Sequence, residues 1–386
     1  MTIEPVWETE ATTRMRILRV EIQRVEDVPL TRPLALGWDP GVVRSHDSFT
    51  VVRVHSDTGL TGVGTVSRSK PARLAAAALI GRDVGATGQN AQILRETGGA
   101  YGLDIALWDL LAQDAGVPLA GLWGAAVDRV PAYVSTVEVG APEQRAEDAL
   151  GFLAEGFRGL KLRLHHATLA EDLALAHAVR EAVGEDMVLM ADANQARAAA
   201  RDTVVRWDFE RALATARALE ELDFAWLEEP LPADALPDLA RLRDDVGIDI
   251  AGGERDQTLA RFTEVIASEA YDIVQPDGVT GESLGELRRI GALAHAHGQR
   301  CIPHHGGGGI GTYAHLHLTA ALPEARWLEV IRDRPGEIPW PAQQVPTVPI
   351  RVAADGAVAV PTGPGLGIEL DEERIAGYTA SRIVID

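Results

Sequence analysis

The sequence contains few cysteines, few lysines and no long apolar run, and each shortage argues against a class of protein. Cys301 is the single cysteine of 386 residues, so no disulfide can form within the chain, and we expect a cytoplasmic location. The 57 acidic residues outnumber the 36 basic ones, which argues against a nucleic-acid-binding surface. No segment is apolar over the length of a membrane span, and residues 1–13 lack the basic start of a secretory signal. A small molecule is therefore the expected partner.

Lysine occurs only twice, at Lys70 and Lys161, and arginine supplies the other basic side chains. An amine kept in a chain that otherwise uses arginine is notable, because arginine stays protonated while an amine can release its proton near neutral pH. Lys161 is therefore a candidate base in a catalytic site.

The chain is longer than most single domains, and its patterns divide it into parts. The expected parts are a disordered N-terminus (1–13), a smaller α+β domain (14–129), a large repetitive domain (130–345) and a C-terminal segment (346–386) that packs on the smaller domain. In the smaller domain we expect strands over residues 16–25, 49–56 and 60–66 and a helix over residues 102–115. A polar loop should join the first two strands.

From Val130 onward, short apolar strands alternate with amphipathic helices, which are clearest over residues 170–183, 208–221 and 283–297. This α/β alternation, eight strands over about 200 residues, is typical of a parallel barrel. The alternative is an open doubly wound sheet, but no glycine-rich dinucleotide motif follows the first strand. The predicted strands cover residues 130–136, 159–164, 187–192, 224–228, 248–254, 272–277, 300–304 and 327–330.

Acidic residues stand at the ends of three successive predicted strands: Asp192, Glu228 and Glu254. Because the C-terminal ends of barrel strands form one ring, these carboxylates should converge at the mouth of the barrel. Like charges this close cannot all stay ionised without a cation, and three oxygen ligands suit Mg²⁺ better than zinc. The alternative for each acid is a helix N-cap or a surface charge. Glu229 is the weaker candidate beside Glu228, since strand alternation turns only one of them inward.

Other strand ends carry possible acids and bases. Lys161 and Arg163 share one strand face, where they could instead be rim cations that balance the carboxylates. A nearby metal ion and Arg163 should lower the pKa of Lys161, as a general base requires. Asp277 and His304 end adjacent strands, the arrangement of an imidazole base oriented by a carboxylate. His305 competes with His304 for this role.

Three further features concern the substrate. Glu329 ends the eighth strand and, if protonated, could donate a hydrogen bond to charge that develops on a substrate oxygen; otherwise it pairs with Arg326 or Arg332. The glycine run at 306–309 should give substrate room, whereas a phosphate cradle would need a P-loop lysine. The candidate substrate contacts are Asn194, His305, Trp38, His46 and Arg32.

Eight motifs, weak singly but specific in this order and spacing, make the chain resemble the mandelate racemase/muconate lactonizing branch of the enolase superfamily over nearly its full length. They are LDIALWDL (103–110), KLR (161–163), ADANQ (191–195), WLEEP (226–230), GGE (252–254), QPD (275–277), PHH (303–305) and WLE (327–329). The resemblance implies a (β/α)7β barrel under an N-terminal α+β capping domain, with a loop over residues 30–48 that closes on the substrate. It also implies one Mg²⁺ per subunit on Asp192, Glu228 and Glu254, enediolate chemistry on a carboxylate, and a homo-oligomer.

The chain departs from this family at one position. Many relatives carry Lys-x-Lys on the second barrel strand, with the second lysine as a base, whereas this chain has Lys161-Leu-Arg163. Arginine is a poor base, so the Asp277–His304 side is expected to remove the proton, with Glu329 as the electrophilic acid. The favoured reaction is dehydration of an acid sugar (an aldonate or aldarate) to a 2-keto-3-deoxy acid. The alternatives are a racemase or epimerase, a lactone cycloisomerase, a non-catalytic metal-binding barrel, and a barrel glycosidase, which would need no metal.

Overall fold

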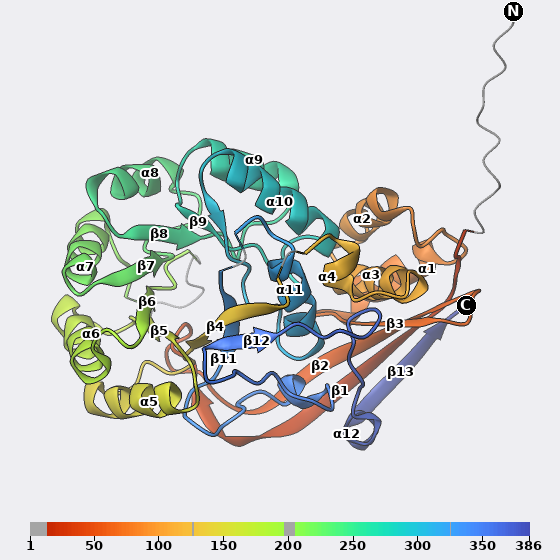
Figure 1. Cartoon of the computed structure of the whole chain (residues 1–386), viewed down its shortest axis with the longest axis horizontal. Coiled ribbons are helices and arrows are strands. Elements are labelled where there is room, and N and C mark those ends of the chain that lie inside the picture. Colours follow the sequence, from red (N-terminus) through yellow and green to blue (C-terminus); the bar gives the residue numbers. More distant parts are fainter. Residues whose placement is uncertain (1–13, 126, 197–204, 325) are drawn as a thin grey trace, which may run out of the picture.

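The computed structural model describes residues 14–125, 127–196, 205–324 and 326–386. The N-terminus predicted to be disordered, residues 1–13, lies outside these ranges. Two sheets organise the chain, a four-stranded antiparallel sheet and a curled sheet of parallel strands, and they lie side by side in Figure 1. Within the described ranges, no helix has the length and apolarity needed to cross a membrane.

The antiparallel sheet has the strand order β13-β1-β2-β3. Its strands are β1 (Ile17–Ala35), β2 (Val43–Ser56), β3 (Thr61–Thr65) and β13 (Thr379–Ile385). The prediction of a long polar loop between the first two strands is wrong, because β1 and β2 continue as a paired hairpin up to Ala35 and Val43. The physical reason is that Val28, Leu30 and Leu34 keep the alternation of a strand and are buried.

Four helices follow β3 along the chain: α1 (Ser69–Leu79), α2 (Thr87–Glu96), α3 (Gly102–Asp114) and α4 (Leu119–Leu122). Helix α3, which carries the LDIALWDL motif, contacts β2 and β3 on one side and helices of the barrel on the other. It approaches β3 so closely that a Cβ at Gly102 would lie 1.5 Å from the Thr65 carbonyl oxygen. Glycine is therefore required at this contact.

The parallel sheet contains eight strands in the order β10-β9-β8-β7-β6-β5-β4-β11. Their bounds are β4 (Arg129–Ser135), β5 (Gly159–Arg163), β6 (Val188–Asp192), β7 (Phe224–Glu228), β8 (Asp249–Gly252), β9 (Ile273–Val274), β10 (Arg300–Cys301) and β11 (Leu328–Ile331). The last strand, β11, returns to pair in parallel with the first, β4, which confirms the predicted (β/α)7β class. No ladder joins β10 to β11 in the described part of the chain, so one seam of the barrel lacks backbone pairing.

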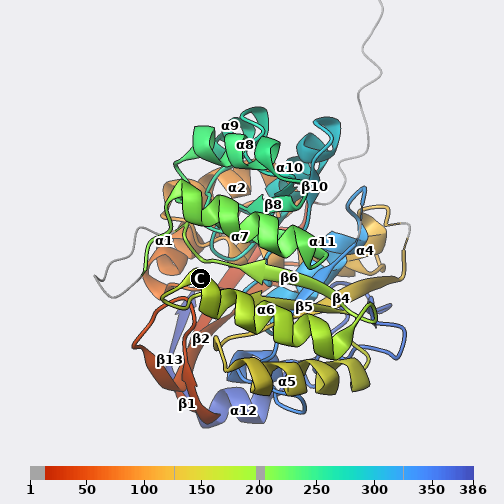
Figure 2. The same cartoon turned by 90° about the vertical axis from the view of Figure 1, so that its left-hand side faces the viewer.

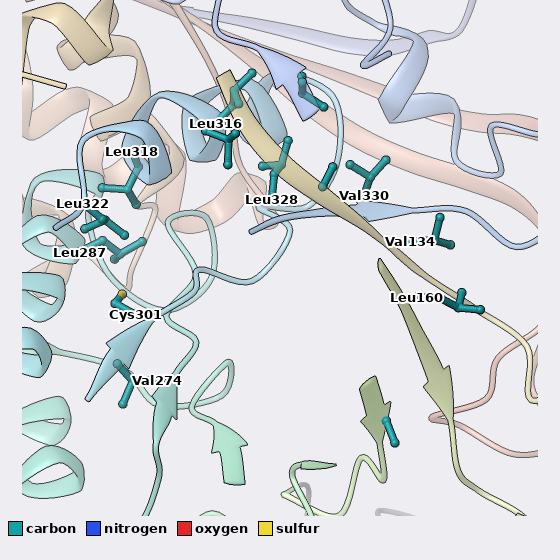
Figure 3. Close-up of a cluster of buried hydrophobic side chains, with 14 of the residues drawn as sticks. Val134, Leu160, Val274, Leu287, Cys301, Leu316, Leu318, Leu322, Leu328 and Val330 are labelled. Atoms are coloured by element: carbon teal, nitrogen blue, oxygen red, sulfur yellow. The ribbon is translucent and has the colours of Figure 1, made fainter. Parts of the chain in front are cut away.

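Helices surround these strands, as the row α5–α8 in Figure 2 shows. The helices are α5 (Pro142–Ala154), α6 (Leu169–Val183), α7 (Phe209–Glu221), α8 (Leu236–Asp245), α9 (Leu259–Ala267), α10 (Leu284–Ala296) and α11 (Ile310–Ala320). Helix α11 lies between β10 and β11 in sequence and is buried along its whole length. Figure 3 shows its Leu316 and Leu318 gathered with Leu328 of β11 and Cys301 of β10. This apolar packing holds the part of the barrel where strand pairing stops.

The C-terminal segment contacts both sheets. It contains β12 (Ala357–Ala359), which pairs with β4 of the barrel, α12 (Glu372–Gly377), and β13, which pairs with β1. A short 3₁₀ helix, η1 (Pro341–Gln344), precedes it and contacts the hairpin of β1 and β2. The segment was expected to pack on the N-terminal domain, where β13 pairs with β1. The strand β12 adds a contact with the barrel that the weak pattern of residues 346–386 did not reveal.

Candidate active site

The ends of β5, β6 and β7 bring four predicted residues side by side. In the parallel ladder, Arg163 lies opposite Asp192, and Asp192 lies opposite Glu228. Lys161 is two residues before Arg163, so strand alternation turns both side chains to one face. All four are buried, and Lys161, Asp192 and Glu228 are 0% exposed. Charges packed in this way must neutralise one another, because an unpaired charge away from water is costly.

Lys161 is surrounded by carboxylates. Its Nζ donates to the two oxygens of Glu228 at 2.7 and 2.8 Å and lies 3.0 Å from Glu329 Oε1. Burial opposes the charged amine, but Glu228 and Glu329 outweigh it and hold the pKa of Lys161 well above its ordinary value. The lowered pKa predicted for Lys161 depended on a nearby metal ion as well as on Arg163, so it stays a prediction. The acids face the amine, while Arg163 is itself paired with Asp192.

The Arg163 guanidinium makes an ion pair, several hydrogen bonds and a contact with an aromatic ring. Its Nη1 pairs with Asp192 Oδ2, and its Cζ lies 5.2 Å from the centroid of the Trp38 ring. Its other hydrogen bonds go to Asn194 Oδ1 (3.2 Å), the Thr136 carbonyl (2.7 Å) and Ser135 Oγ (2.9 Å). Burial opposes its charge, yet Asp192 more than compensates and raises the pKa of Arg163. This guanidinium is suited to hold a position and a charge, and unsuited to remove a proton.

Glu228 and Glu229 follow one another at the end of β7 but have different surroundings. Glu228 accepts hydrogen bonds from Lys161 and from Gln275 Nε2, the latter at 2.7 Å. Burial, opposed by Lys161 and reinforced by Asp192, raises the pKa of Glu228 to about 7. Glu229 has a φ of 47°, is buried, and its Oε1 lacks a hydrogen-bond partner among the described residues. Glu228 is thus the member of the pair that lies among the other charged residues of the site. We call this group the charged cluster; it comprises Lys161, Arg163, Asp192, Glu228 and Glu254.

His304 lies between two carboxylates. Its Nδ1 bonds to Asp277 Oδ2 at 2.7 Å, and its Nε2 lies 2.9 Å from Glu254 Oε2. Asp277 Oδ1 also accepts backbone hydrogen bonds from Val279 and Thr280, each at 2.8 Å. Burial opposes a charged imidazole, but Glu254 and Asp277 hold the pKa of His304 well above its ordinary value. The geometry is that of an imidazole oriented by a carboxylate.

His305 and Glu329 complete the ring of strand ends. The His305 ring lies 3.9 Å from the His304 ring, and burial together with the charge of His304 lowers its pKa to about 3. His305 is therefore the weaker base of the two. Glu329 lies 3.0 Å from Lys161 Nζ, although neither of its oxygens has a well-aligned hydrogen bond within the described residues. Burial favours the neutral acid, but Lys161 prevails and lowers the pKa of Glu329. The role of Glu329 as a donor, which requires a protonated carboxyl, stays a prediction.

The three predicted metal ligands each contact protein cations: Asp192 pairs with Arg163, Glu228 with Lys161, and Glu254 with His304 and Arg255. In the described ranges, no three acidic or imidazole side chains are posed around one point as an ion site requires. The donor set nevertheless fits Mg²⁺, because it consists of three buried carboxylates on neighbouring strands. Repulsion from Asp192 and Glu254 contributes to the raised pKa of Glu228, and a divalent cation would relieve it.

A cavity of about 210 Å³ opens beside these groups. Its lining includes Trp38, Arg163, Asn194, Glu254, Arg255, Asp277, Thr280, His304 and His305. A second cavity of about 160 Å³ shares Trp38 and His305 with it and extends to Arg44, Asp47 and Trp340. A larger cavity of about 340 Å³ lies between α2, α3 and α10 and contains none of the predicted site residues. The chemistry therefore belongs to the first two cavities.

Two predicted substrate contacts, Arg32 and His46, line neither cavity of the site. Arg32 pairs with Asp333, with Glu138 at 2.8 Å and with Glu337 at 3.2 Å. His46 is exposed and bonds to its neighbour Ser45. Both residues were placed in a loop that closes on the substrate, whereas they belong to the strands of the β1–β2 hairpin. The hairpin reaches the site through Trp38 in its turn and through Arg44 and Asp47 at the start of β2.

Sequence reasoning missed several polar groups of the site, namely Ser135, Thr136, Gln275, Tyr133 and Arg255. Ser135 and Thr136 end the first barrel strand, so the rule applied to the other strands would have found them. Gln275 stands two residues before Asp277 in the QPD motif and bonds to Glu228. Tyr133 is fully buried with its ring 5.6 Å from Lys161 Nζ, and no pattern in the sequence marked it.

Comparisons with known proteins agree with this geometry. Residues 144–374 match the family model described as "Enolase C-terminal domain-like". Arabinonate dehydratase from Saccharolobus solfataricus is 34% identical over 236 residues, which cover 60% of this chain and 60% of that protein. The 3,6-anhydro-alpha-L-galactonate cycloisomerase from Streptomyces coelicolor is 29% identical over 345 residues, covering 84% of this chain and 89% of that one.

A solved structure of a related protein has a similar fold. The crystal structure of L-talarate/galactarate dehydratase from Salmonella typhimurium LT2, liganded with Mg and L-lyxarohydroxamate, matches with a TM-score of 0.85 at 27% identity. It covers 100% of this chain and 98% of that one. The chain spans about three fifths of the length of the two dehydratases that it matches among curated proteins. Since the family model covers more than half of its residues, the chain belongs to the enolase superfamily.

Proposed function

We propose that the protein is a Mg²⁺-dependent acid sugar dehydratase, which converts an aldonate or aldarate to a 2-keto-3-deoxy acid. The observation that carries the proposal is that Asp277 and His304 share one cavity with Arg163 and Glu254 of the charged cluster. A base therefore stands beside the place where a substrate carboxylate would be held. The names of related proteins, dehydratases of arabinonate and of talarate/galactarate, support this reaction.

Each side chain has a role that follows from its contacts. Asp192, Glu228 and Glu254 would hold Mg²⁺, which when bound stabilises negative charge on the substrate carboxylate. His304, oriented through Nδ1 by Asp277, takes the α-proton at Nε2 and leaves an enediolate. The protonated His304 then gives this proton to the β-hydroxyl, which departs as water, and the resulting enol rearranges to the keto acid.

The opposite side of the cluster favours dehydration over racemisation. A racemase needs a group that can give or take a proton on each face of the α-carbon. Arg163 is bonded to Asp192, Ser135 and Thr136 and stays charged, and Lys161 is held charged by Glu228. These two cations can orient the substrate carboxylate and stabilise its charge. Despite burial, Glu254 and Asp277 raise the pKa of His304 as well, but a Glu254 carboxylate that binds Mg²⁺ would no longer face Nε2, which leaves His304 as the base.

A lactone cycloisomerase is the second candidate. The Streptomyces coelicolor cycloisomerase matches 84% of this chain, a larger share than either dehydratase. The same His304 would remove the α-proton in that reaction, so the two candidates differ in the group that leaves and not in the base.

The test is a screen of aldonates, aldarates and their lactones with Mg²⁺, with semicarbazide to trap keto acids and D₂O to follow α-proton exchange. We expect a trapped keto acid with Mg²⁺, none with EDTA, and recovery when Mg²⁺ is restored. A deuterated substrate without keto acid would identify an epimerase, and a ring-opened or lactone isomer a cycloisomerase. Full turnover in EDTA would overturn the metal assignment.

His304→Asn should abolish α-proton exchange while Mg²⁺ binding survives. His305→Asn is the matched control, because the adjacent ring lines the same cavity but has a low pKa. It should keep exchange within about tenfold of the wild-type rate, since it loses contacts and not the base. Wild-type exchange in His304→Asn would move the base to another residue.

A further inference from the structure

Asp277 and His304 follow strands with short ladders, since β8–β9 and β9–β10 each pair at two positions, as β4–β5 do. The strands β9 and β10 pair at only two positions, Ile273 with Arg300 and Val274 with Cys301. Beyond these positions, two backbone hydrogen bonds continue between the segments, from the Ile302 N–H to the Val274 carbonyl at 3.0 Å and from the His304 N–H to the Pro276 carbonyl at 3.2 Å. On its other side, β10 has no ladder with β11 in the part of the chain that the structure describes. Only a few backbone hydrogen bonds on one side of β10 therefore fix the two loops relative to each other.

The chain that follows His304 adds little stiffness of its own. The four residues Gly306–Gly309 all have positive φ, between 54° and 89°. Glycine adopts these angles without strain but loses more conformational freedom on folding than any other residue. Contacts from outside the loop must therefore hold it.

His315 of α11 supplies such a contact. Its Nδ1 donates to the carbonyl oxygen of His304, and its Nε2 accepts from the backbone N–H of Gly278 at 3.0 Å. Gly278 follows Asp277 directly, so one imidazole ring ties the two loops that carry the Asp277–His304 pair. A carbonyl can only accept and an amide N–H can only donate, which fixes His315 as the neutral tautomer with its proton on Nδ1. Burial also lowers the pKa of His315.

The His315 side chain is buried and tightly packed. The residue is 1% exposed, and a Cβ at Gly278 would lie 2.8 Å from its Nε2. A Cβ at Gly306 would lie 3.1 Å from its Cδ2, so both loops need glycine where they meet the ring. The same helix adds a second tie, because Thr312 Oγ1 donates to the His305 carbonyl at 3.0 Å. Helix α11 is thus a rigid support for both loops.

We propose that His315 is a positioning residue, whose neutral imidazole holds the loops of Asp277 and His304 in register and thereby aims the His304 ring into the cavity. The inference rests on the proposed role of His304 as the base. Because His315 lines neither cavity of the site, its loss should lower kcat and leave KM nearly unchanged. Supports of this kind are typically worth about 10–100-fold in activity.

His317, two residues further along α11, is a matched control. It is also fully buried and also bridges two backbone groups. Its Nδ1 accepts from the Ala120 N–H at 3.1 Å and its Nε2 donates to the Leu366 carbonyl at 3.1 Å. These partners lie in α4 and the C-terminal segment, away from the Asp277–His304 pair. Removing His317 should therefore cost stability without misaligning the base.

The experiment compares kcat, KM, α-proton exchange in D₂O and Tm for His315→Phe, His315→Asn, His315→Gln and His317→Phe. Asn keeps a donor near Nδ1 and Gln keeps an acceptor near Nε2, so each should restore part of what Phe loses. We expect His315→Phe to lower kcat and the exchange rate together by about 10–100-fold with KM within a few-fold. His317→Phe should lower Tm by a similar amount with exchange at the wild-type rate. Unchanged exchange in His315→Phe, or an equal loss in His317→Phe, would overturn the inference.

The wild-type protein gives a second test that does not depend on whether the variants fold. In ¹⁵N-labelled protein, a coupling across the hydrogen bond should join the Gly278 amide nitrogen to an imidazole Nε2 without a proton. An Nε2–H tautomer, or no such coupling, would contradict the tie. If the wild type neither turns over an acid sugar nor exchanges its α-proton, the proposed function fails while this spectroscopic test still stands. If the wild type is active and His315→Phe exchanges equally fast, only the inference about His315 fails.

Discussion

The two sides of the site are built in different ways. On the ladder side, which comprises Lys161, Arg163, Asp192 and Glu228, β5 and β6 pair over five positions and the charged side chains leave directly from the paired residues. On the loop side, which comprises Asp277 and His304, β9 and β10 pair over two positions, and the side chains lie beyond them. Strand register places the residues of the ladder side next to one another, whereas the loop side depends more on single hydrogen bonds such as those of His315.

The difference extends to energetics. On the ladder side, each buried charge is neutralised by another buried charge, so the loss of one leaves its partner exposed to an apolar interior. On the loop side, Asp277 also accepts three backbone hydrogen bonds, which would still satisfy it without His304. Substitutions on the ladder side should therefore lower stability and activity together. Substitutions on the loop side should lower activity with a smaller change in stability.

The largest effect is expected from Asp192→Asn on the ladder side. Turnover and Mg²⁺ binding should be lost, and the free energy of unfolding should fall by about 3–5 kcal/mol, because Arg163 stays buried without its carboxylate. His304→Asn should instead lower turnover by about 100–10,000-fold with a much smaller change in stability. Urea unfolding, calorimetry with Mg²⁺ and turnover measure the three quantities. An Asp192→Asn protein as stable as the wild type would contradict the proposed contrast.

A smaller effect is expected where the β1–β2 hairpin covers the ladder side. Trp38 faces the Arg163 guanidinium and lines both cavities of the site. Trp38→Leu should raise KM about tenfold, which corresponds to roughly 1.4 kcal/mol, and change kcat less. His46→Ala on the same hairpin should leave KM within about twofold, since surface substitutions are usually nearly neutral. Steady-state kinetics with the best substrate measures both variants. Equal effects on KM would refute the assignment of Trp38 to the substrate cavity.

The last expected effect concerns the pH dependence of stability, at Asp104 of α3, which lies against the start of α10. Its Oδ2 accepts from the Gly285 N–H at 3.1 Å, and burial raises its pKa to about 7. Because the folded protein holds this proton more tightly than the unfolded chain does, the free energy of unfolding should fall as pH rises from about 4 to about 7 and then level off. The contribution is at most about 1.4 kcal/mol per pH unit. Asp104→Asn should flatten this slope in urea unfolding at pH 5, 6 and 7, and an unchanged slope would rule Asp104 out as its source.

The strand order and the strand-end residues of the barrel were predictable because both are local. The strand Phe224–Glu228 was predicted at its observed bounds, since apolar residues continue up to the acid that ends it. The predicted strand at 248–254 was too long, because Gly253 has a φ of 109° and leaves the ladder. The hairpin of β1 and β2 was missed, because Pro29 and Pro33 argued against a strand although Val28, Leu30 and Leu34 keep its alternation.

Pairings between distant residues could not be predicted from the sequence. Arg32 was expected at the substrate, but its carboxylate partners Glu138 and Asp333 come from the loops after β4 and β11. The pKa of Lys161 depends on the sum of several charges, and only the distances to Glu228 and Glu329 decide its direction. The role of His315 was hidden for the same reason, since a buried histidine in a helix gives no sign of which backbone groups it will meet.

The pairing of β13 with β1, which places Val20 opposite Ile385, has a consequence for how the protein is made. As the chain leaves the ribosome, β1, β2 and β3 emerge first, and the outer edge of β1 stays without a partner until every barrel strand has been synthesised. An unpaired edge of this kind can pair with other chains. The antiparallel sheet therefore begins to form first and is completed last. Slow synthesis or early termination would leave the edge of β1 that pairs with β13 open to other chains.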